Sequence, residues 1–517
     1  MKIFHRTLAI GCSALALSAC GADEIISPGT SGDINITNNT TNPAPTPPPT
    51  PTAGGVTAAA GCPTVGAQAL TNAGTIMGPE GTWRICELPA VISSDMDLPR
   101  IDGLLYSLGG RTDVGSDGGP EPDDSDGLTD TDVTLSIDPG VIIYGATGRS
   151  YLVVNRGNQI DAVGTADMPI IFTSRDNVLG LNSDTSIGQW GGVVLLGRAP
   201  VSDCFEGGFN KPDQADCEQR LEGAALTTLF GGDTADDSSG TMQYFQIRFS
   251  GFTLALGSEL QSLTLGGIGS GTVIDHWQSF NSSDDGTEFF GGSIDMSEVV
   301  VVGADDDALD VDTGAQANLY NVIVAQRMNG GDNLIELDSP DDDYDTDALP
   351  QTVFNVNSFT FLERSGSNSQ AVRARGGALL NLSNGVIDTN EETCIRIDEQ
   401  VTIDAGPTFN SIVGDCDPAR PFDGVAGDDS DVQAIWDAGS NNDEAFTITL
   451  TSLFVNGTNE NGVATFDPTG LSAFFSDPAN IGAVFPGNDD WYVGWTCNSA
   501  TAGFGTNTGD CTAIPVF

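Results

Sequence analysis

The sequence is almost devoid of lysine and histidine, two residue types on which much enzyme chemistry depends. Beyond residue 20 it holds one lysine, Lys211, and one histidine, His276. His276 lies in a hydrophobic stretch beside Trp277, which predicts a packed side chain. With no second histidine to serve as a base, catalysis by an activated serine or cysteine is excluded.

Positive charge of any kind is also scarce. The chain has 18 Lys and Arg against 72 Asp and Glu, a net charge of −54 at pH 7. Such a field repels nucleic acids and anionic lipid surfaces. We therefore expect no nucleic-acid partner; metal cations, basic proteins and neutral glycans remain as classes of ligand.

The only long hydrophobic run stands at the very start. Residues 1–19 carry Lys2 and Arg6, then an apolar run, and Leu-Ser-Ala precedes Cys20. A short basic start, a brief apolar core and small residues before a cysteine are typical of a bacterial lipoprotein signal peptide. Cys20 is thus the predicted lipidation site, and its acyl chains would anchor the protein to a membrane.

Location follows from the residue after Cys20. The residue after Cys20 is Gly21 and not Asp, and in this the chain is similar to lipoproteins that are sent on to the outer membrane. We expect a lipid anchor there, with the cell surface favoured over the periplasmic side. Residues 20–60 are rich in Asn, Thr, Pro, Gly and Ala, which predicts a lipidated cysteine followed by a disordered tether.

A short acidic phrase recurs three times in the middle of the chain. The copies are SDDGTEFFGG, DDDALDVDTG and GDNLIELDSP. Thr287, Leu309 and Ile335 align at offsets of 22 and 26 residues. A nearly constant period in the twenties, with alternating apolar and polar positions, indicates a solenoid.

The composition of the repeats selects the type of solenoid. They combine short Val, Ile, Thr and Phe runs with Gly and Asp-Gly turns, and the leucine-rich consensus is missing. This favours an all-β fold, a parallel β-helix whose rungs stack about 4.8 Å apart. Outward residues at equivalent positions then form ladders. One predicted ladder contains Glu288, Asp310, Glu336, Arg373 and Arg396, and its neighbour contains Asp312, Asp338, Arg375 and Asp398.

Stacked carboxylates repel one another and raise each other's pKa. Between Phe280 and Asp345 there are seventeen acids and one base, Arg327. Calcium prefers clustered oxygen ligands, so we expect structural calcium between the rungs, with an open acidic face as the alternative. The candidate metal ligands are Asp284, Asp285, Glu288, Asp306, Asp307, Asp310, Asp312, Glu336 and Asp338.

Eight further cysteines fall into pairs of sequence neighbours. An exported protein forms disulfides by default, and proximity predicts four local bridges. The expected pairs are Cys62 with Cys86, Cys204 with Cys217, Cys394 with Cys416, and Cys497 with Cys511.

The expected boundaries of the folded part are an N-terminal cap at 61–132, the β-helix at 133–430 and a C-terminal cap at 431–517. Trp491, Tyr492 and Trp495 are expected to cover the last rung, with a sugar-stacking surface as the alternative.

Several phrases together resemble a known family. They are PIIFTS, GQWGGVVLLGRAPV, LFGGDTADDSSG, GGIGSGTVIDHWQSFNSSDDGTEFFGG and NIGAVFPGNDDWYVGWTC. The set is similar to bacterial secreted lipoproteins predicted to form pectin-lyase-like right-handed β-helices. The resemblance covers about residues 92–497. It implies the fold and an exported location, and that family has no established activity.

Three functions remain open at this point. We favour a surface-anchored, calcium-stabilised module that binds a glycan or an envelope protein. A calcium-dependent polysaccharide lyase is the alternative from another class, with Arg373 and Arg396 as weak candidates for the base. The favoured alternative for these arginines is a structural role as counter-ions for Glu336 and Asp338. A structural or adhesive surface protein is the third reading.

Overall fold

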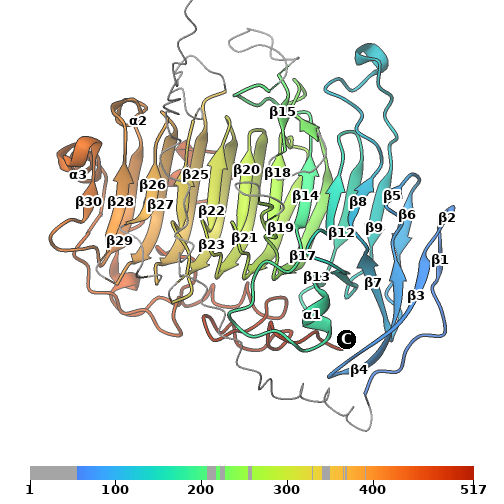
Figure 1. Ribbon diagram of the computed structural model, residues 1–517. Helices are drawn as coiled ribbons and strands as arrows, with labels where there is room; N and C mark the ends of the chain where they lie inside the picture. The colour runs from blue at the N-terminus through green and yellow to red at the C-terminus, as the bar shows by residue number, and fades with distance from the viewer. Residues whose placement is uncertain are drawn as a thin grey trace, which may run out of the picture. The chain divides into compact units, whose positions relative to one another are not determined.

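The computed structural model describes residues 55–205, 217–221, 228–253, 259–328, 330–339, 350–364, 366, 370–390 and 392–517 (Figure 1). The predicted signal peptide, Cys20, most of the predicted tether and Lys211 lie outside the described residues. Among the helices that are described, none is both long enough and apolar enough to cross a membrane.

Two large sheets of stacked strands form the body, and the first contains only parallel pairs. Its strands are short and follow one another at successive rungs. In order they are β5 (Val91–Ile92), β8 (Arg111–Val114), β11 (Tyr151–Val154), β14 (Gly192–Leu196), β18 (Leu263–Gly266), β20 (Thr287–Phe290), β22 (Leu309–Asp312), β24 (Ile335–Leu337), β26 (Gln370–Ala374), β28 (Thr393–Ile397) and β30 (Phe422–Asp423).

The second sheet is parallel except for its first hairpin, β3 with β4. Its main path is β3 (Thr71–Gly78), β4 (Gly81–Glu87), β7 (Leu104–Leu108), β10 (Ile142–Gly145), β13 (Ile170–Ser174), β17 (Gly240–Arg248), β19 (Val273–Phe280), β21 (Ser293–Val302), β23 (Gln316–Ala325), β25 (Val353–Leu362), β27 (Leu379–Asp388) and β29 (Thr408–Gly414). Three further strands form a branch: β12 (Gln159–Val163) pairs with β17 and with β9 (Thr134–Ile137), and β9 pairs with β6 (Met96–Leu98).

The long strands of the second sheet each bend at one residue. β12 pairs with the first half of β17, and β13 pairs with the second half. The residue between the two halves has positive φ, and so do its counterparts on the following rungs. These corner residues are Tyr244, His276, Glu298, Asn321, Ser358, Asn384 and Ser411. Each rung therefore has three faces, two of which are supplied by a single bent strand.

The interior is a stack of apolar columns. Phe289, Val311 and Leu337 occupy one column on consecutive rungs, and all three are buried. Thr287 pairs with Leu309 on the neighbouring strand, as the repeat alignment predicted. The all-β parallel helix and its register across these rungs are therefore confirmed.

Parallel stacking begins earlier than residue 133. β6 pairs with β9 and β7 with β10, so the rung at residues 96–114 already belongs to the helix. The expected cap at 61–132 reduces to the hairpins β3–β4 and β1–β2 (Thr64–Val65 and Gln68–Ala69) and to a loop between β8 and β9. The repeat could not be recognised in the sequence before residue 133, because its strands there are only two to five residues long and a long acidic loop interrupts their spacing. The expected tether also ends sooner, because Val56 bridges to Gly81.

The C-terminal segment does two things, only one of which was expected. Helix α3 (Ser430–Ala438) packs Trp436 against Phe422 and Phe409 of the last strands, with ring centroids 5.1 and 6.2 Å apart. Residues 440–517, here called the return segment, instead run back along the second sheet (Figure 1). Phe517 accepts a hydrogen bond from Arg100, so the segment reaches the first rungs rather than capping the last.

The return segment covers an apolar outer face. The second halves of the long strands turn Phe280, Val300, Val302 and Ile323 outward, and these pack against Trp495 and its neighbours as a second core. Uninterrupted apolar runs such as residues 299–302 are typical of strands buried on both faces. Trp491, Tyr492 and Trp495 therefore neither cap the last rung nor form an open aromatic platform.

Polar side chains fix the return segment along the sheet. Gln278 Oε1 accepts from the Cys497 backbone N–H at 2.8 Å. The fully buried Arg248 donates to the carbonyls of Cys511 at 3.0 Å and Ala513 at 2.8 Å. Burial lowers the pKa of Arg248 to about 9.

Helices and 3₁₀ turns are few and peripheral among the described residues. Besides α3, they are α1 (Arg175–Val178), α2 (Gln400–Asp404), η1 (Asp124–Asp126), η2 (Val425–Gly427), η3 (Glu460–Gly462) and η4 (Pro468–Gly470). All four predicted cysteine pairs are bonded, with Cα–Cα separations of 5.0–5.6 Å. The Cys204–Cys217 bridge lies in the loop that carries the hairpin β15–β16 (Gln219–Arg220 and Leu229–Phe230).

Trp495→Ala tests the role of the return segment. We expect a loss of about 3–5 kcal/mol in unfolding free energy, as for other buried tryptophan truncations. Limited proteolysis should then cut within residues 440–517 well before it cuts the strands. Cleavage sites and rates identical to those of the unmodified chain would contradict this description.

Candidate functional site

The predicted acidic ladder exists as a row of neighbouring strand positions. Glu288 pairs with Asp310, and Asp310 pairs with Glu336 on the next strand. The row continues through Arg373 and Arg396. Its side chains point away from the core, because the residues on either side of each one are buried in the apolar columns.

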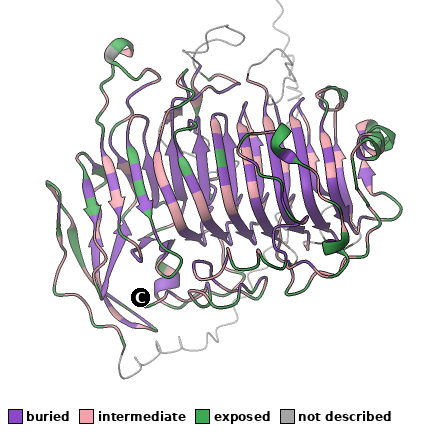
Figure 2. Cartoon of the chain, turned by 180° about the vertical axis from the view of Figure 1, so that it is seen from behind, coloured by how far each residue is buried: buried purple, intermediate pink, exposed green. Residues whose placement is uncertain are grey.

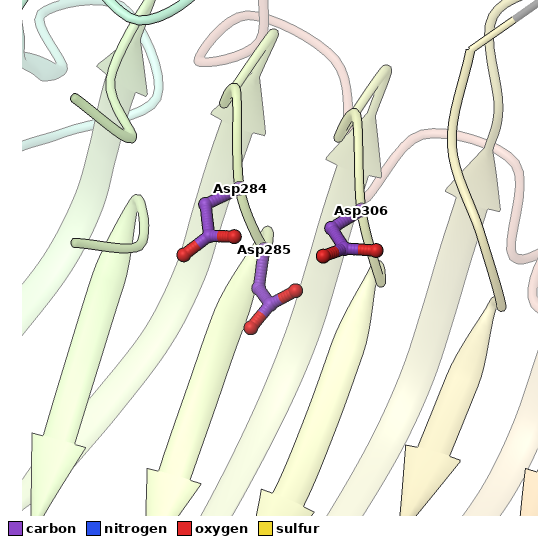
Figure 3. A group of neighbouring side chains, drawn as sticks. All are labelled: Asp284, Asp285 and Asp306. Atoms are coloured by element: carbon purple, nitrogen blue, oxygen red, sulfur yellow. The ribbon is translucent and has the colours of Figure 1, made fainter. Parts of the chain in front are cut away.

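A second row of acids lies at the turns that enter these strands. Asp284 and Asp285 precede β20, and Asp306 and Asp307 precede β22 (Figure 3). Asp332 holds the equivalent position before β24. The turn row and the strand row lie close together, and they make one acidic surface over three consecutive rungs.

The described carboxylates form three groups that could hold a metal ion. Within each group one oxygen per residue lies within 4.8 Å of the others. Calcium binds oxygen at 2.3–2.6 Å, so two ligands of one ion are at most about 5 Å apart, and the spacing fits. The groups are Asp284, Asp285 and Asp306; Asp285, Glu288 and Asp310; and Asp306, Asp307 and Asp332.

Six of the nine predicted ligands belong to these groups, and three do not. The six are Asp284, Asp285, Glu288, Asp306, Asp307 and Asp310. Glu336 and Asp338 lie instead beside arginine, and Asp312 Oδ1 accepts a hydrogen bond from the backbone of Thr313. The candidate metal centre is therefore shifted toward the turns relative to the sequence prediction.

Asp332 was missed as a candidate ligand. It stands three residues before Ile335, the same offset as Asp284 before Thr287 and Asp306 before Leu309. The aligned phrases already carried this signal.

The turn acids are held by hydrogen bonds between rungs. Asp285 Oδ1 accepts from the Asp307 backbone N–H at 3.0 Å, and Asp307 Oδ1 accepts from the Asn333 N–H at 2.5 Å. Gln370 then donates to Asn333 Oδ1 at 2.9 Å. Each rung thus fixes one side-chain oxygen of the rung before it.

Arginine neutralises the other end of the strand row. Arg373 contacts Glu336 at 3.4 Å and Asp398 at 2.9 Å, and Arg375 contacts Asp338 at 3.0 Å. Arg396 also pairs with Asp398. Both weak catalytic candidates, Arg373 and Arg396, therefore have carboxylate partners, as the counter-ion reading expected.

Burial and neighbouring charge raise the pKa of the turn acids. For Asp306, burial is the largest cause and the charges of Asp332 and Glu336 add to it. Together they raise the pKa of Asp306 from 3.8 to about 7. Burial also raises the pKa of Asp285 well above its ordinary value, reinforced by Asp284 and Asp310.

The same two causes act on the remaining members. Burial is the main cause that raises the pKa of Asp307 well above 3.8, and the charges of Glu336 and Asp306 contribute next. Burial raises the pKa of Asp310 too, although Arg375 pulls it down. Without a cation these groups can relieve their repulsion only by binding protons.

Neighbouring stretches of the same sheet face differ in chemistry. Toward the first rungs, Val153, Val194 and Phe290 are covered by the loop that holds Cys204 and Cys217. Toward the last rungs, the arginine pairs occupy the face. The acidic groups lie between these two zones.

A cavity of about 310 Å³ lies elsewhere, between the first rungs and the end of the return segment. Trp83, Tyr106 and Ile142 line it, together with Arg100 and Phe517. None of the acids described above contributes to its wall. It is therefore separate from the candidate metal centre.

The raised pKa values predict how the metal-free protein responds to pH. An acid whose pKa is higher in the folded chain binds protons more readily when folded, so stability falls as pH rises from about 4 to about 7. For Asp306, a rise from 3.8 to about 7 corresponds to about 4 kcal/mol. Thermal unfolding by circular dichroism at pH 5 and pH 8, after chelating resin, measures the fall.

The control separates this site from the general acidity of the chain. Asp306→Asn should flatten the fall between pH 5 and pH 8, because the group no longer titrates. Asp161→Asn, at an exposed position on β12, should leave it unchanged. Equal slopes for the two variants would show that Asp306 has no special role.

Comparison with known proteins agrees with this architecture. The model of a family described as a pectate-lyase-like β-helix domain matches residues 125–458, more than half of the chain. The searches of curated proteins and of solved structures gave no match. With the stacked parallel sheets, the match establishes that the chain belongs to the pectate-lyase-like β-helix family.

Proposed function

We propose that this protein is an outer-membrane lipoprotein whose β-helix is stabilised by calcium and serves as a binding module. The observation that carries the proposal is the set of three carboxylate groups on consecutive rungs. They share Asp285 and Asp306, so ions bound there would link neighbouring rungs. Calcium fits because all the side-chain ligands are oxygens.

The anchor is proposed from the start of the sequence. Leu-Ser-Ala before Cys20 supports lipidation there, and Gly21 supports transfer to the outer membrane. The Pro- and Thr-rich tether would hold the folded part away from the membrane, which favours the cell surface over the periplasmic side.

Binding is favoured over catalysis by the state of the arginines. A lyase of this fold needs a basic residue that accepts a proton from a uronate. Burial lowers the pKa of Arg373, but Glu336 and Asp398 outweigh it and the net pKa is raised. Such a group stays protonated, which disfavours it as a base. A calcium-dependent lyase remains the second candidate because acids and arginines share one sheet face.

The net charge of the protein limits the classes of ligand that it can bind. A net charge of −54 disfavours nucleic acids and anionic surfaces. A glycan or another envelope protein fits the proposed location. A purely structural or adhesive role would use the same calcium-bound β-helix without a soluble ligand.

Calcium should raise the melting temperature of residues 55–517. A ligand that binds only the folded state stabilises by RT ln(1 + [L]/Kd), about 2.7 kcal/mol per site at 100 times Kd. Thermal unfolding with calcium and with chelator measures the difference. No shift at millimolar calcium would overturn the metal proposal.

Substitution at the metal groups should have opposite effects with and without calcium. Asp306→Asn removes repulsion, so the chelated variant should be more stable than the chelated unmodified chain. The same change removes a ligand and should reduce the calcium-induced shift. Asp161→Asn serves as the control and should retain the full shift. A reduced shift in both variants would point to general charge screening.

Cys20→Ser tests the anchor. The variant lacks the thiol that would carry the lipid, so it should lose radiolabelled palmitate incorporation and leave the membrane fraction. Cys497→Ser, at a bridge within the folded part, is the matched control and should remain labelled. Labelling of Cys20→Ser would place the anchor elsewhere.

A further inference from the structure

One outer face of the β-helix is lined by amide, hydroxyl and aromatic side chains. It is formed by the first halves of the long strands, before the corner residues, and is called here the amide face. Inward residues such as Met296 and Leu319 belong to the core, so the alternate residues point outward. The outward positions used below are Gln243, Asp275, Asp295, Ser297, Asn318, Tyr320, Asn355, Asn381 and Thr408.

A hydrogen-bonded row crosses this face with one side chain on each strand. Asn318 donates to Asp295 Oδ1 at 2.7 Å, and Asn355 donates to Asn318 Oδ1 at 2.8 Å. Asn381 donates to Asn355 at 2.8 Å, and Thr408 donates to Asn381 at 2.6 Å. An amide has two N–H groups and two lone pairs, so each amide in the row keeps hydrogen-bonding capacity beyond its neighbours.

The row is most accessible at the end that holds Asp295, and Thr408 at its other end is half-buried. Asp295 is exposed and Asn318 is half-buried, whereas Asn355 and Asn381 are 8% and 6% exposed. Figure 2 shows partly exposed and exposed residues as a band across otherwise buried strands. The part of the amide face around Asp295, over β19, β21 and β23, therefore contains the most exposed member of the row.

Aromatic groups flank the accessible end. Tyr320 is half-buried and lies on the strand next to Ser297, which pairs with Asp275. At the corner, Tyr244 stacks on His276 at 4.2 Å between ring centroids. His276 Nδ1 lies 2.6 Å from Asp275 Oδ1, and 21% of its side chain remains exposed.

The charge of this face selects among ligands. Asp275, Asp295 and Glu298 are its charged groups, and no Lys or Arg occupies the outward positions of the described strands β17 to β29 before the corner. Like charges would repel uronates, sulfated sugars and phosphates. A neutral sugar offers hydroxyls to amides and carboxylates and an apolar ring face to an aromatic side chain.

Periodicity favours a polymer over a folded protein. On the accessible strands, Asp295 and Asn318 are neighbours about 4.8 Å apart, the spacing between strands, and Asp275, Ser297 and Tyr320 follow one another at the same spacing. A chain of repeating sugars meets such a row with repeating hydroxyls. A folded globular partner with an irregular surface would not repeat its hydrogen-bonding groups at this spacing.

We propose that the amide face is the binding site for a neutral polysaccharide, with Tyr320 as stacking platform and Asn318 and Asp295 as hydrogen-bonding partners. The inference rests on the proposed binding function and gives it a surface and a ligand class. It places the site on the second sheet, away from the acidic groups on the first. Calcium and sugar are thus assigned to different faces.

Affinity electrophoresis tests the inference with gels that contain hydroxyethylcellulose, dextran, xylan or polygalacturonate. We expect retardation by at least one neutral polymer and none by polygalacturonate. Tyr320→Ala should weaken that retardation at least tenfold, and Tyr320→Phe should retain most of it because the ring is kept. Asn318→Asp removes the N–H donors beside Asp295 and should weaken it as well.

Asp161→Ala, on β12 beside the first half of β17, is the control and should bind as the unmodified chain does. Thermal unfolding of each variant establishes that it is folded. Absence of retardation by every neutral polymer would overturn the inference, as would equal binding by Tyr320→Ala. Retardation by polygalacturonate that is lost in Arg373→Ala would assign the ligand to the first sheet instead. A calcium-induced rise in melting temperature that persists alongside any of these results would leave the calcium-stabilised module standing.

Discussion

Repulsion between stacked carboxylates is the constraint on which the organisation of this protein depends. Two unit charges about 5 Å apart repel by roughly 3 kcal/mol at an effective dielectric constant of about 20. A few such pairs equal the net stability of a typical domain, about 5–15 kcal/mol. Toward the last rungs Arg373 and Arg375 relieve the repulsion. At the turns the charges of Asp285 and Asp306 require a bound proton or cation, and calcium is the cation that we propose for neutral pH.

The β-helix lets one chain separate three chemistries on three faces. The first sheet carries the acids, and its other zones are covered by a disulfide-closed loop or neutralised by arginine. The second halves of the long strands are covered by the return segment, which buries Val300 and Ile323. Their first halves remain the open, polar amide face. The bend at the positive-φ corner residues separates the covered face from the open one.

The register could be predicted because the repeated phrases fix which residues stack. Leu309 falls over Thr287 and Glu336 over Asp310, as the offsets required. The rungs at residues 96–114 were hidden by short strands and a long loop. The course of residues 440–517 could not be predicted because it is set by long-range contacts, such as that between Gln278 and Cys497. The acids were predicted individually, but their grouping depends on turn geometry, and so Asp332 was missed.

The most direct test of the account is a crystal structure grown with calcium, with anomalous diffraction recorded to locate the ions. The account predicts anomalous peaks between the rungs, each about 2.4 Å from oxygens of Asp285, Asp306 or both. It also predicts none beside Asp338, where Arg375 supplies the positive charge. Well-ordered carboxylates without peaks at millimolar calcium would contradict it and leave the ladder as an open acidic face.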